Sequence, residues 1–370
     1  MKITFCNTTA LFLLRSPLFD QRSDTTRSAL APRGASAAIR SQKGTPFPRS
    51  SRPLHEQAAY PHAPTRPSGR ITSSREVARL IREMATALSL PPDQPVHLID
   101  HDRRRPRAHE GVVFHRWGVE TPRRRLLLIS DNIRLLGPEL CLLDLARFAS
   151  EIDVLMLAGE FCGTYALDPT CSAGFRTRDP LTTRRKIIQC AKENAGHAGS
   201  ARLQAIAPLI CERAASPMET ALAILCRLSY QRGGLGLPAP LMNHRLDPGR
   251  RGRDIAEQGH YVCDLYWPEQ RVALEYDSNA FHTGADRLNH DAHRRTGLQG
   301  IGVTVITVTR DQLFDPALFR RLDQALHRLL HVQRRPRCSD YDKRQRTLRR
   351  HVLGLDQPEG SLAHLIRFGW

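Results

Sequence analysis

A predicted β-hairpin is the feature that most constrains the fold of this chain. Residues 260–267 (HYVCDLYW) and 271–277 (RVALEYD) are rich in β-branched, aromatic and aliphatic residues, and the turn residues PEQ (268–270) lie between them. Two such runs separated by a few turn-forming residues predict two antiparallel strands. The acidic residues on these strands then need an explanation.

Three carboxylates lie on the predicted hairpin. Asp264 is on the first strand, whereas Glu275 and Asp277 share one face of the second because side chains alternate along a strand. If the turn centres on Glu269 and Gln270, Asp264 lies opposite Glu275. Strands disfavour aspartate, and like charges opposite each other are destabilising. We therefore expect Asp264 and Glu275 to have a role beyond folding.

A helix with a strong start signal is predicted before the hairpin. In SPMETALAILCRLSY (216–230), Ser216 is the expected N-cap, Pro217 the first helical residue and Glu219 the acid of a capping box. Apolar residues recur at helical spacing until GGLGLPAP (233–240) ends the helix.

The elements after the hairpin complete a fold prediction. DRLNHDAHRRTGLQG (286–300) reads as a helix, and VTVITVT (303–309) is an apolar run typical of a strand covered on both faces. Residues 315–331 form an amphipathic helix pattern. The order helix, hairpin, helix, strand, helix over residues 216–331 predicts an α/β sandwich around a mixed sheet.

Three carboxylates in one place favour a bound cation. Like charges raise each other's pKa, and a divalent metal relieves that cost. Oxygen ligands suit Mg²⁺ or Mn²⁺. His282, in the loop after the second strand, could deprotonate an attacking water near neutral pH. Arg294 and Arg295 on the next helix could clamp a phosphate.

Most of these residues also have a purely structural explanation. The capping box alone explains Glu219, and Asp277 can begin an Asx turn. His282 is one of 16 histidines, and a lone histidine is usually structural. A solvated helix face with an internal ion pair explains Asp291, Arg294 and Arg295.

The combined pattern resembles a known family. D-L-x-W-P-E-x-x-V-A-x-E-Y-D-[GS]-x-x-x-H, then D-x-x-R-R, then G-x-x-V-x-x-[VI]-T, is similar to restriction-endonuclease-like bacterial proteins of the PD-(D/E)xK superfamily, close to the very-short-patch-repair DNA endonucleases. The matching stretches are Asp264 to Asp277, His282, Asp291 to Arg295 and Gly302 to Thr309, with Ser216 to Glu219 matching the first helix.

The resemblance implies a metal-dependent hydrolysis of DNA. Asp264 and Glu275 would hold Mg²⁺ or Mn²⁺, with Glu219 or Asp277 assisting, and His282 would be the general base. The metal would polarise a phosphodiester and activate water. The site residues implied are therefore Asp264, Glu275, Asp277 and His282 for catalysis, Asp264, Glu275 and Glu219 for the metal, and Arg294 and Arg295 for nucleic acid.

This sequence departs from the family pattern at two positions. The superfamily's lysine after the second acid is absent, because Glu275 and Tyr276 are followed by Asp277. The short-patch-repair-like branch also does without that lysine and uses a histidine. Ser278 stands where close relatives often have glycine. The alternative is thus a catalytically inactive DNA-binding or antitoxin-type regulatory protein that retains the fold.

The composition favours an acidic partner. The chain has 55 Lys and Arg against 37 Asp and Glu, a formal net charge of +18, so nucleic acid is the first candidate. Only five of these basic residues are lysine, a bias that GC-rich coding also produces. The stretch RRPRCSDYDKRQRTLRR (334–350) would follow phosphates. We expect DNA, although an RNA-directed nuclease would share the site.

Residues 1–70 carry 11 basic and three acidic residues, and few apolar residues after Phe19. This composition predicts disorder. The segment could instead be a basic arm for nucleic acid, or sequence translated from an early start codon. Its short apolar opening is interrupted by Arg15 and does not predict a signal peptide.

We expect four segments. A disordered basic segment (1–70) precedes a small α+β middle domain (71–213), the restriction-endonuclease-like domain (214–332) and a basic tail (333–370). In the middle domain, the patterns predict a helix at 71–90, strands in 95–117 and at 123–130, helices in 138–157 and 183–213, and a polar loop at 168–182. Residues 92–160 faintly resemble the domain beside such nucleases in antitoxin-like and abortive-infection proteins.

Other classes of protein are disfavoured. The chain has no run of 18 apolar residues, so we expect no membrane partner. Its nine cysteines include no C-x-x-C pair, which argues against a zinc knuckle or a disulfide framework. Reduced thiols in a cytoplasmic protein without a small-molecule cofactor are the expected state.

Overall fold

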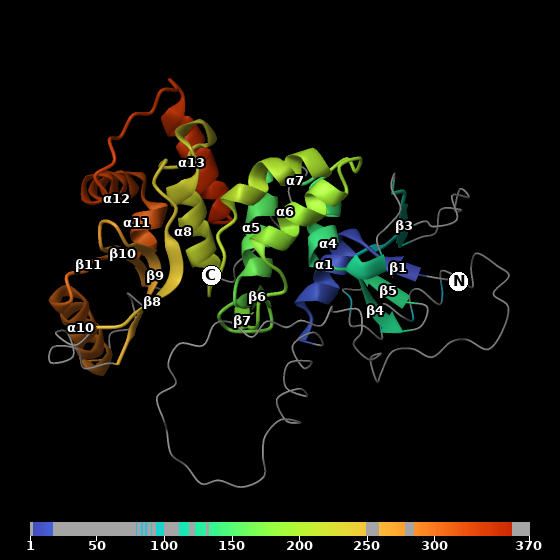
Figure 1. The fold of residues 1–370 in the computed structure, drawn as a ribbon, viewed down its shortest axis with the longest axis horizontal. Coiled ribbons are helices and arrows are strands. Elements are labelled where there is room, and N and C mark those ends of the chain that lie inside the picture. The colour runs from blue at the N-terminus through green and yellow to red at the C-terminus, as the bar shows by residue number, and fades with distance from the viewer. Residues whose placement is uncertain are drawn as a thin grey trace, which may run out of the picture. The chain divides into compact units, whose positions relative to one another are not determined.

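Two mixed β-sheets, each with helices, organise this α/β chain (Figure 1). The structure is a computed structural model that describes residues 3–17, 79, 83, 86, 90, 94–99, 111–117, 123–130, 133–248, 259–277 and 285–356. The chain divides into two compact units: residues 1–147 with 190–200, and residues 148–189 with 201–370. Among the described helices, none is long and apolar enough to span a membrane.

The first unit is built on a five-stranded sheet with the order β3-β2-β1-β5-β4. The N-terminal strand β1 (Ile3–Phe5) is central: it pairs antiparallel with β2 (Val96–Ile99) and parallel with β5 (Ile133–Leu136). The outer strands are β3 (Val112–His115), parallel to β2, and β4 (Leu126–Ser130), antiparallel to β5. The predicted strands in 95–117 and at 123–130 are confirmed.

The N-terminal end of the chain corrects the prediction that residues 1–70 are disordered. Helix α1 (Asn7–Arg15) follows β1 directly and packs against α4 (Pro138–Leu145) and β2. Phe5 and Leu11 are fully buried. A composition averaged over 70 residues concealed a short apolar run that fills a core. Residues 18–70 lie outside the described part of the chain, as does most of the predicted helix at 71–90.

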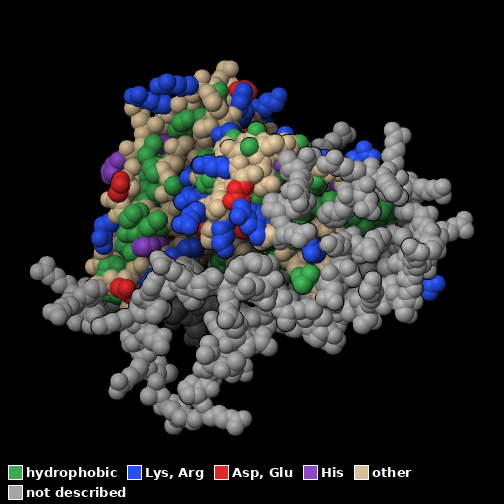
Figure 2. All heavy atoms as spheres, turned by 45° about the vertical axis from the view of Figure 1, so that its right-hand side comes forward, with side chains coloured by type: hydrophobic (Ala, Val, Ile, Leu, Met, Phe, Trp, Pro, Cys, Tyr) green, Lys and Arg blue, Asp and Glu red, His purple; other side chains and the backbone are tan. Residues whose placement is uncertain are grey.

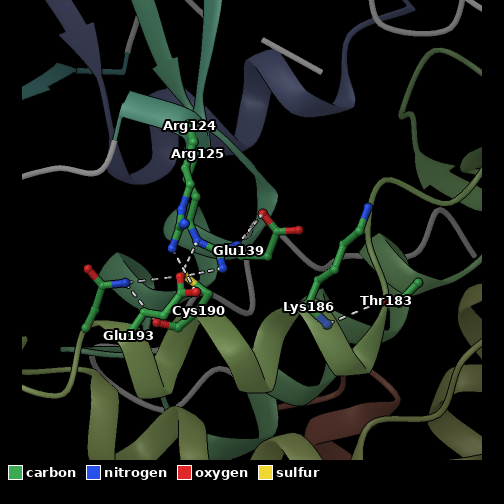
Figure 3. Close-up of polar contacts among 8 residues, drawn as sticks. Arg124, Arg125, Glu139, Thr183, Lys186, Cys190 and Glu193 are labelled. Atoms are coloured by element: carbon green, nitrogen blue, oxygen red, sulfur yellow. Dashed lines mark hydrogen bonds and ion pairs between the residues drawn. The ribbon is translucent and has the colours of Figure 1, made fainter. Parts of the chain in front are cut away.

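An ion-pair cluster ties residues 190–200 to the rest of the first unit. Arg125, in the 3-10 helix η3 (Arg123–Arg125), donates to Glu193 Oε2 through Nη2 at 2.7 Å, and Arg124 lies 2.8 Å from the other oxygen. Figure 3 shows both guanidinium groups pointing toward Glu193. Burial raises the pKa of the adjacent Cys190 thiol to about 12. The cluster is therefore structural, and Cys190 is a poor nucleophile.

The second unit begins with helix α5 (Glu151–Cys162). Its N-cap Ser150 and Asp153 form a capping box. A short hairpin of β6 (Tyr165–Leu167) and β7 (Phe175–Thr177) follows, so the predicted polar loop at 168–182 contains a strand. The predicted helical region continues as α6 (Arg184–Glu193), whose end belongs to the first unit, then as α7 (Ser200–Ile206) and the 3-10 helix η4 (Ala207–Leu209).

The second sheet contains the predicted hairpin. Its order is β11-β10-β9-β8, in which β9 (Tyr261–Trp267) and β10 (Val272–Asp277) are antiparallel. β11 (Thr304–Thr309) runs parallel to β10, so the sheet is mixed as expected. The sequence did not predict β8 (Leu241–Leu246), which pairs antiparallel with β9.

Strand β11 differs from the prediction of a strand covered on both faces. It lies at the sheet edge, and only Val308 of its six residues is buried. On the sheet face near Tyr266 and Ala273, the covering residues are Leu298 of α10 (Ala285–Gly300) and Val303. An apolar run indicates a strand but not how many faces are covered.

The remaining helices pack beside this sheet. α8 (Pro217–Arg227) contacts β9 and α13 (Tyr341–Val352). α11 (Arg310–Phe314) and α12 (Pro316–Leu329) follow β11. The 3-10 helix η5 (Tyr230–Arg232) joins them: the hydroxyl of Tyr230 hydrogen-bonds His327 of α12 at 2.9 Å.

The predicted basic tail (333–370) is partly integrated into the second unit. Tyr341, Leu348 and Val352 of α13 are buried, and the Tyr341 ring meets Tyr230 edge-on. The division between the two units also falls at residue 148 instead of the predicted 214. The many arginines of residues 334–350 predicted a basic tail and hid the helical pattern of α13. The apolar side of α13 is evident only from its contacts in the folded unit.

Candidate functional site

Asp264 and Glu275 lie at the same place along the β9–β10 hairpin. The ladder pairs Trp267 with Val272 and Leu265 with Leu274, and the next residues on the two strands are Asp264 and Glu275. There the Asp264 carboxylate reaches the neighbouring strand and accepts a hydrogen bond from the backbone N–H of Tyr276 at 2.9 Å. The turn is placed as the sequence predicted.

Glu219 joins this region from the first turn of α8. Ser216 caps the helix, and its side chain accepts from the Glu219 N–H while donating to Glu219 Oε1 at 2.9 Å. Glu219 also accepts from the backbone N–H of Ala215 at 2.7 Å and from the side-chain amide of Asn243. The predicted N-cap is therefore confirmed, but the Glu219 carboxylate accepts from the backbone N–H of Ala215 instead of that of Ser216, so the predicted capping box is not closed.

Burial raises the pKa of all three carboxyl groups, and a neighbouring negative charge adds to the shift in two of them. Burial raises the pKa of Asp264 and of Glu275, and the negative charge of Asp264 raises that of Glu275 further. Burial and the charge of Asp264 raise the pKa of Glu219 to about 7. Such shifts occur where acids share a desolvated place with too little positive charge.

Arg294 supplies part of that positive charge. Its Nη1 lies 2.7 Å and 2.6 Å from the two oxygens of Glu275, and its Nη2 donates to the carbonyl of Val262. The sequence predicted Arg294 as a phosphate clamp. In the structure its guanidinium is held inside the site instead, because α10 lies against the same end of the hairpin.

The other predicted site residues are less closely involved. Arg295 is exposed and its Nη2 donates to Thr307 Oγ1 at 3.3 Å. Asp277 ends β10, opposite Thr309 of β11, and is half-buried. His282 lies outside the described residues, as does the side chain of Asp291.

Sequence reasoning missed Asn243, which holds Glu219 in place. Asn243 lies on β8 with a φ of 44°, in the left-handed region that asparagine tolerates better than most residues. Its amide also donates to the carbonyl of Arg213 at 2.8 Å. The polar sequence LMNHRL lacks the apolar alternation that predicts a strand.

The carboxylate oxygens at this site suit a hard divalent cation, but Arg294 already contacts one of the carboxylates. Carboxylate oxygens are the ligands that Mg²⁺ and Mn²⁺ prefer, and burial raises the pKa of all three carboxyl groups. Within the described residues, however, no three Asp, Glu, His or Cys side chains are grouped closely enough to hold a metal ion. Arg294 occupies both oxygens of Glu275.

One face of the described part of the chain is basic. On the face drawn in Figure 2, Lys and Arg side chains cover more of the coloured surface than Asp and Glu do. This agrees with the net charge of +18. A polyanion would be attracted to such a surface at low ionic strength.

Comparisons with known proteins give little about function. No family model matches this chain, and no solved structure matches it. Two uncharacterised proteins of Mycobacterium tuberculosis, from strains CDC 1551 / Oshkosh and ATCC 25618 / H37Rv, are each 28% identical over 136 residues. The match covers 37% of this chain and 45% of each relative, so the chain spans less than half the length of those relatives.

Proposed function

We propose that the second unit is a restriction-endonuclease-like domain of the PD-(D/E)xK superfamily that hydrolyses DNA phosphodiesters with Mg²⁺ or Mn²⁺. The observation that supports this most is the approach of Asp264 and Glu275 on adjacent strands, with Glu219 contributed by the preceding helix. Buried carboxylates on adjacent strands are costly for folding and gain a purpose as a cation site.

Asp264 and Glu275 would hold the metal, with Glu219 close by. When bound, the metal polarises the phosphodiester and activates a water molecule. Asn243 and Ser216 fix the orientation of the Glu219 carboxyl. His282 is the proposed general base, Asp277 at the end of β10 the proposed assisting carboxylate, and Arg295 the exposed contact to DNA. A cytoplasmic location follows from the same proposal.

For a cation to bind the Glu275 carboxylate, the ion pair between Arg294 and Glu275 must break. The guanidinium now neutralises the carboxylate, so a divalent ion at Glu275 would replace one positive charge by two. The released Arg294 would then lie beside the bound phosphate, which is the clamping role that the sequence suggested.

The same ion pair favours the second candidate, a DNA-binding or antitoxin-type regulator without catalysis. Nη1 of Arg294 contacts both oxygens of Glu275 and satisfies the carboxylate with no metal. This candidate requires no cation at Asp264 and predicts DNA binding that EDTA does not change.

Calorimetric titration with Mn²⁺ or Mg²⁺ separates the two candidates. We expect one ion to bind wild type, and Asp264→Asn to abolish that binding. Glu269→Gln removes an exposed acid from the turn of the same hairpin and serves as the matched control. Equal heats from wild type and Asp264→Asn would refute the cation site and favour the regulator.

A further inference from the structure

A second site, distinct from the carboxylates, lies between α12 and α13. A cavity of about 40 Å³ opens there, and it is lined on the α12 side by Phe319, Arg320 and Asp323 and on the α13 side by Gln345, Arg346 and Arg349. We propose that this cavity binds a phosphate group. It contains more positive than negative side chains, because Arg334 also lines it and Asp342 is the second acid.

Two buried donors point to an acceptor in this cavity. Among the residues that the structure describes, three side-chain atoms lining this cavity are buried without a hydrogen-bond partner: the donors Gln345 Nε2 and Arg349 Nε, and the acceptor Asp323 Oδ1. Arg349 is only 3% exposed. Leaving such a donor unpaired is costly, more so when it is charged. An oxyanion would satisfy both nitrogens.

The orientation of Arg349 is fixed by contacts that leave its Nε free. Its Nη1 donates to the carbonyls of Leu313 and Phe314 at 3.0 Å and 3.3 Å, and the guanidinium lies over the ring of Phe319, 5.2 Å from the ring centroid. The side chain is thus built into the wall of the cavity. Preorganised guanidinium groups suit phosphate, whose oxygens take several donors at once.

At this cavity, within the part of the chain that the structure describes, the acid Asp323 is paired, whereas two of the arginines are not. Arg334 forms an ion pair with one oxygen of Asp323 at 2.8 Å, and His327, which is charged only when protonated, lies 2.8 Å from the other. Arg320 and Arg346 are exposed, and the described residues offer neither of them an ion-pair partner. Two arginines therefore remain available at the mouth, beside the buried Arg349.

A larger neighbouring cavity indicates what carries the phosphate. It measures about 190 Å³, shares Pro316, Arg346 and Arg349 with the first, and is otherwise lined mainly by apolar residues, including Leu313, Phe314 and Leu353. An apolar surface beside a phosphate cavity fits a nucleoside, either in a nucleic-acid strand or in a free nucleotide. The shared chemistry is a phosphate ester.

The test compares charge-matched variants of the full chain. Arg320→Gln with Arg346→Gln removes two charges from the cavity, whereas Arg328→Gln with Lys343→Gln removes two exposed charges from the same helices outside it. Gln345→Glu places a carboxylate where the unpaired amide lies. Binding of a short labelled DNA duplex, inorganic phosphate and a nucleoside monophosphate is measured in EDTA, so the result is independent of hydrolysis.

If nucleic acid is the source, the cavity variants weaken DNA binding and lower the slope of log Kd against log salt by about 1 or more relative to the control pair. If a small phosphate ester is the source, phosphate or the nucleotide binds wild type and the control pair but not the cavity variants, while DNA affinity is equal in both pairs. Equal binding of all three ligands by cavity and control variants, or no binding to wild type, overturns the proposal.

Discussion

At the scale of single residues, the pair of Arg294 and Glu275 decides how the candidate site is understood. Both oxygens of Glu275 are held by one guanidinium. The pKa of Glu275 is nevertheless raised, because burial outweighs the attraction of Arg294. Arg294 therefore offsets only part of the cost of burying the Glu275 carboxylate. A divalent cation, with its higher charge, would offset more of it.

Removing that arginine should favour metal binding. We expect Arg294→Ala to tighten Mn²⁺ binding by about tenfold, because a competing charge within contact distance of Glu275 is lost. Arg295→Ala, one residue along α10, is the control and should leave the Mn²⁺ affinity unchanged. Titration calorimetry measures both. Weaker Mn²⁺ binding in Arg294→Ala would mean that the arginine supports the site instead of competing for it.

A histidine pair in the first unit predicts a dependence on pH. His97 Nδ1 lies 2.7 Å from His115 Nε2, and burial lowers the pKa of His97 to about 4. A lowered histidine pKa gives stability that is present above the unfolded value of about 6.5 and is lost as the pH falls toward 4. Because His97 is half-buried, we expect a loss of about 1–2 kcal/mol.

Hydrogen exchange of the β2 and β3 amides between pH 7 and pH 4.5 measures this loss. His97→Gln should flatten the dependence, whereas substitution of the exposed His260 by Gln should not. A wild-type protection that does not change with pH would contradict the assignment.

At the scale of elements, the crossing of α5 and α8 depends on a small residue. A Cβ added to Gly159 in the interior of α5 would overlap the methyl group of Thr220 on α8. The hydroxyl of Thr220 meanwhile hydrogen-bonds Tyr165 at 3.0 Å. Glycine is therefore kept in a helix interior despite its low helix propensity.

We expect Gly159→Ala to destabilise the protein by about 1–3 kcal/mol, because overpacking outweighs the gain of about 1 kcal/mol from helix propensity. Thr220→Ser removes the methyl group and keeps the hydroxyl, so the double variant should recover part of the loss. Chemical denaturation of the four proteins measures the coupling. Strictly additive effects would show that the two side chains do not meet.

How far the elements could be predicted depended on their local signals. The N-cap at Ser216 and the hairpin turn are contained in a few adjacent residues, and both were placed correctly. β1 was missed because it has only three residues, and β8 because its polar sequence lacks the apolar alternation of a strand. For the site, Asp264 and Glu275 followed from the hairpin alone. Asn243 and the Arg294 contact required the tertiary structure.

At the scale of the whole molecule, the N-terminal residues decide whether the first unit folds. β1 separates β2 from β5, so its removal divides the five-stranded sheet into two pieces. We expect deletion of residues 1–17 to make residues 94–147 sensitive to proteolysis, while residues 201–356 stay resistant. Limited proteolysis with mass spectrometry checks this. Unchanged resistance of residues 94–147 would show that β1 is dispensable.

The central proposal concerns the second unit. It is that the carboxylates of the β9–β10 hairpin hold the metal ion with which this unit cleaves DNA. The most direct measurement is nicking of supercoiled plasmid DNA in Mg²⁺ or Mn²⁺ by wild type, Asp264→Asn, Glu275→Gln and the control Glu269→Gln. We predict that wild type and Glu269→Gln cut, and that the other two variants are slower by about a hundredfold or more. Equal cutting by all four proteins, or none by any with either metal, would contradict the proposal.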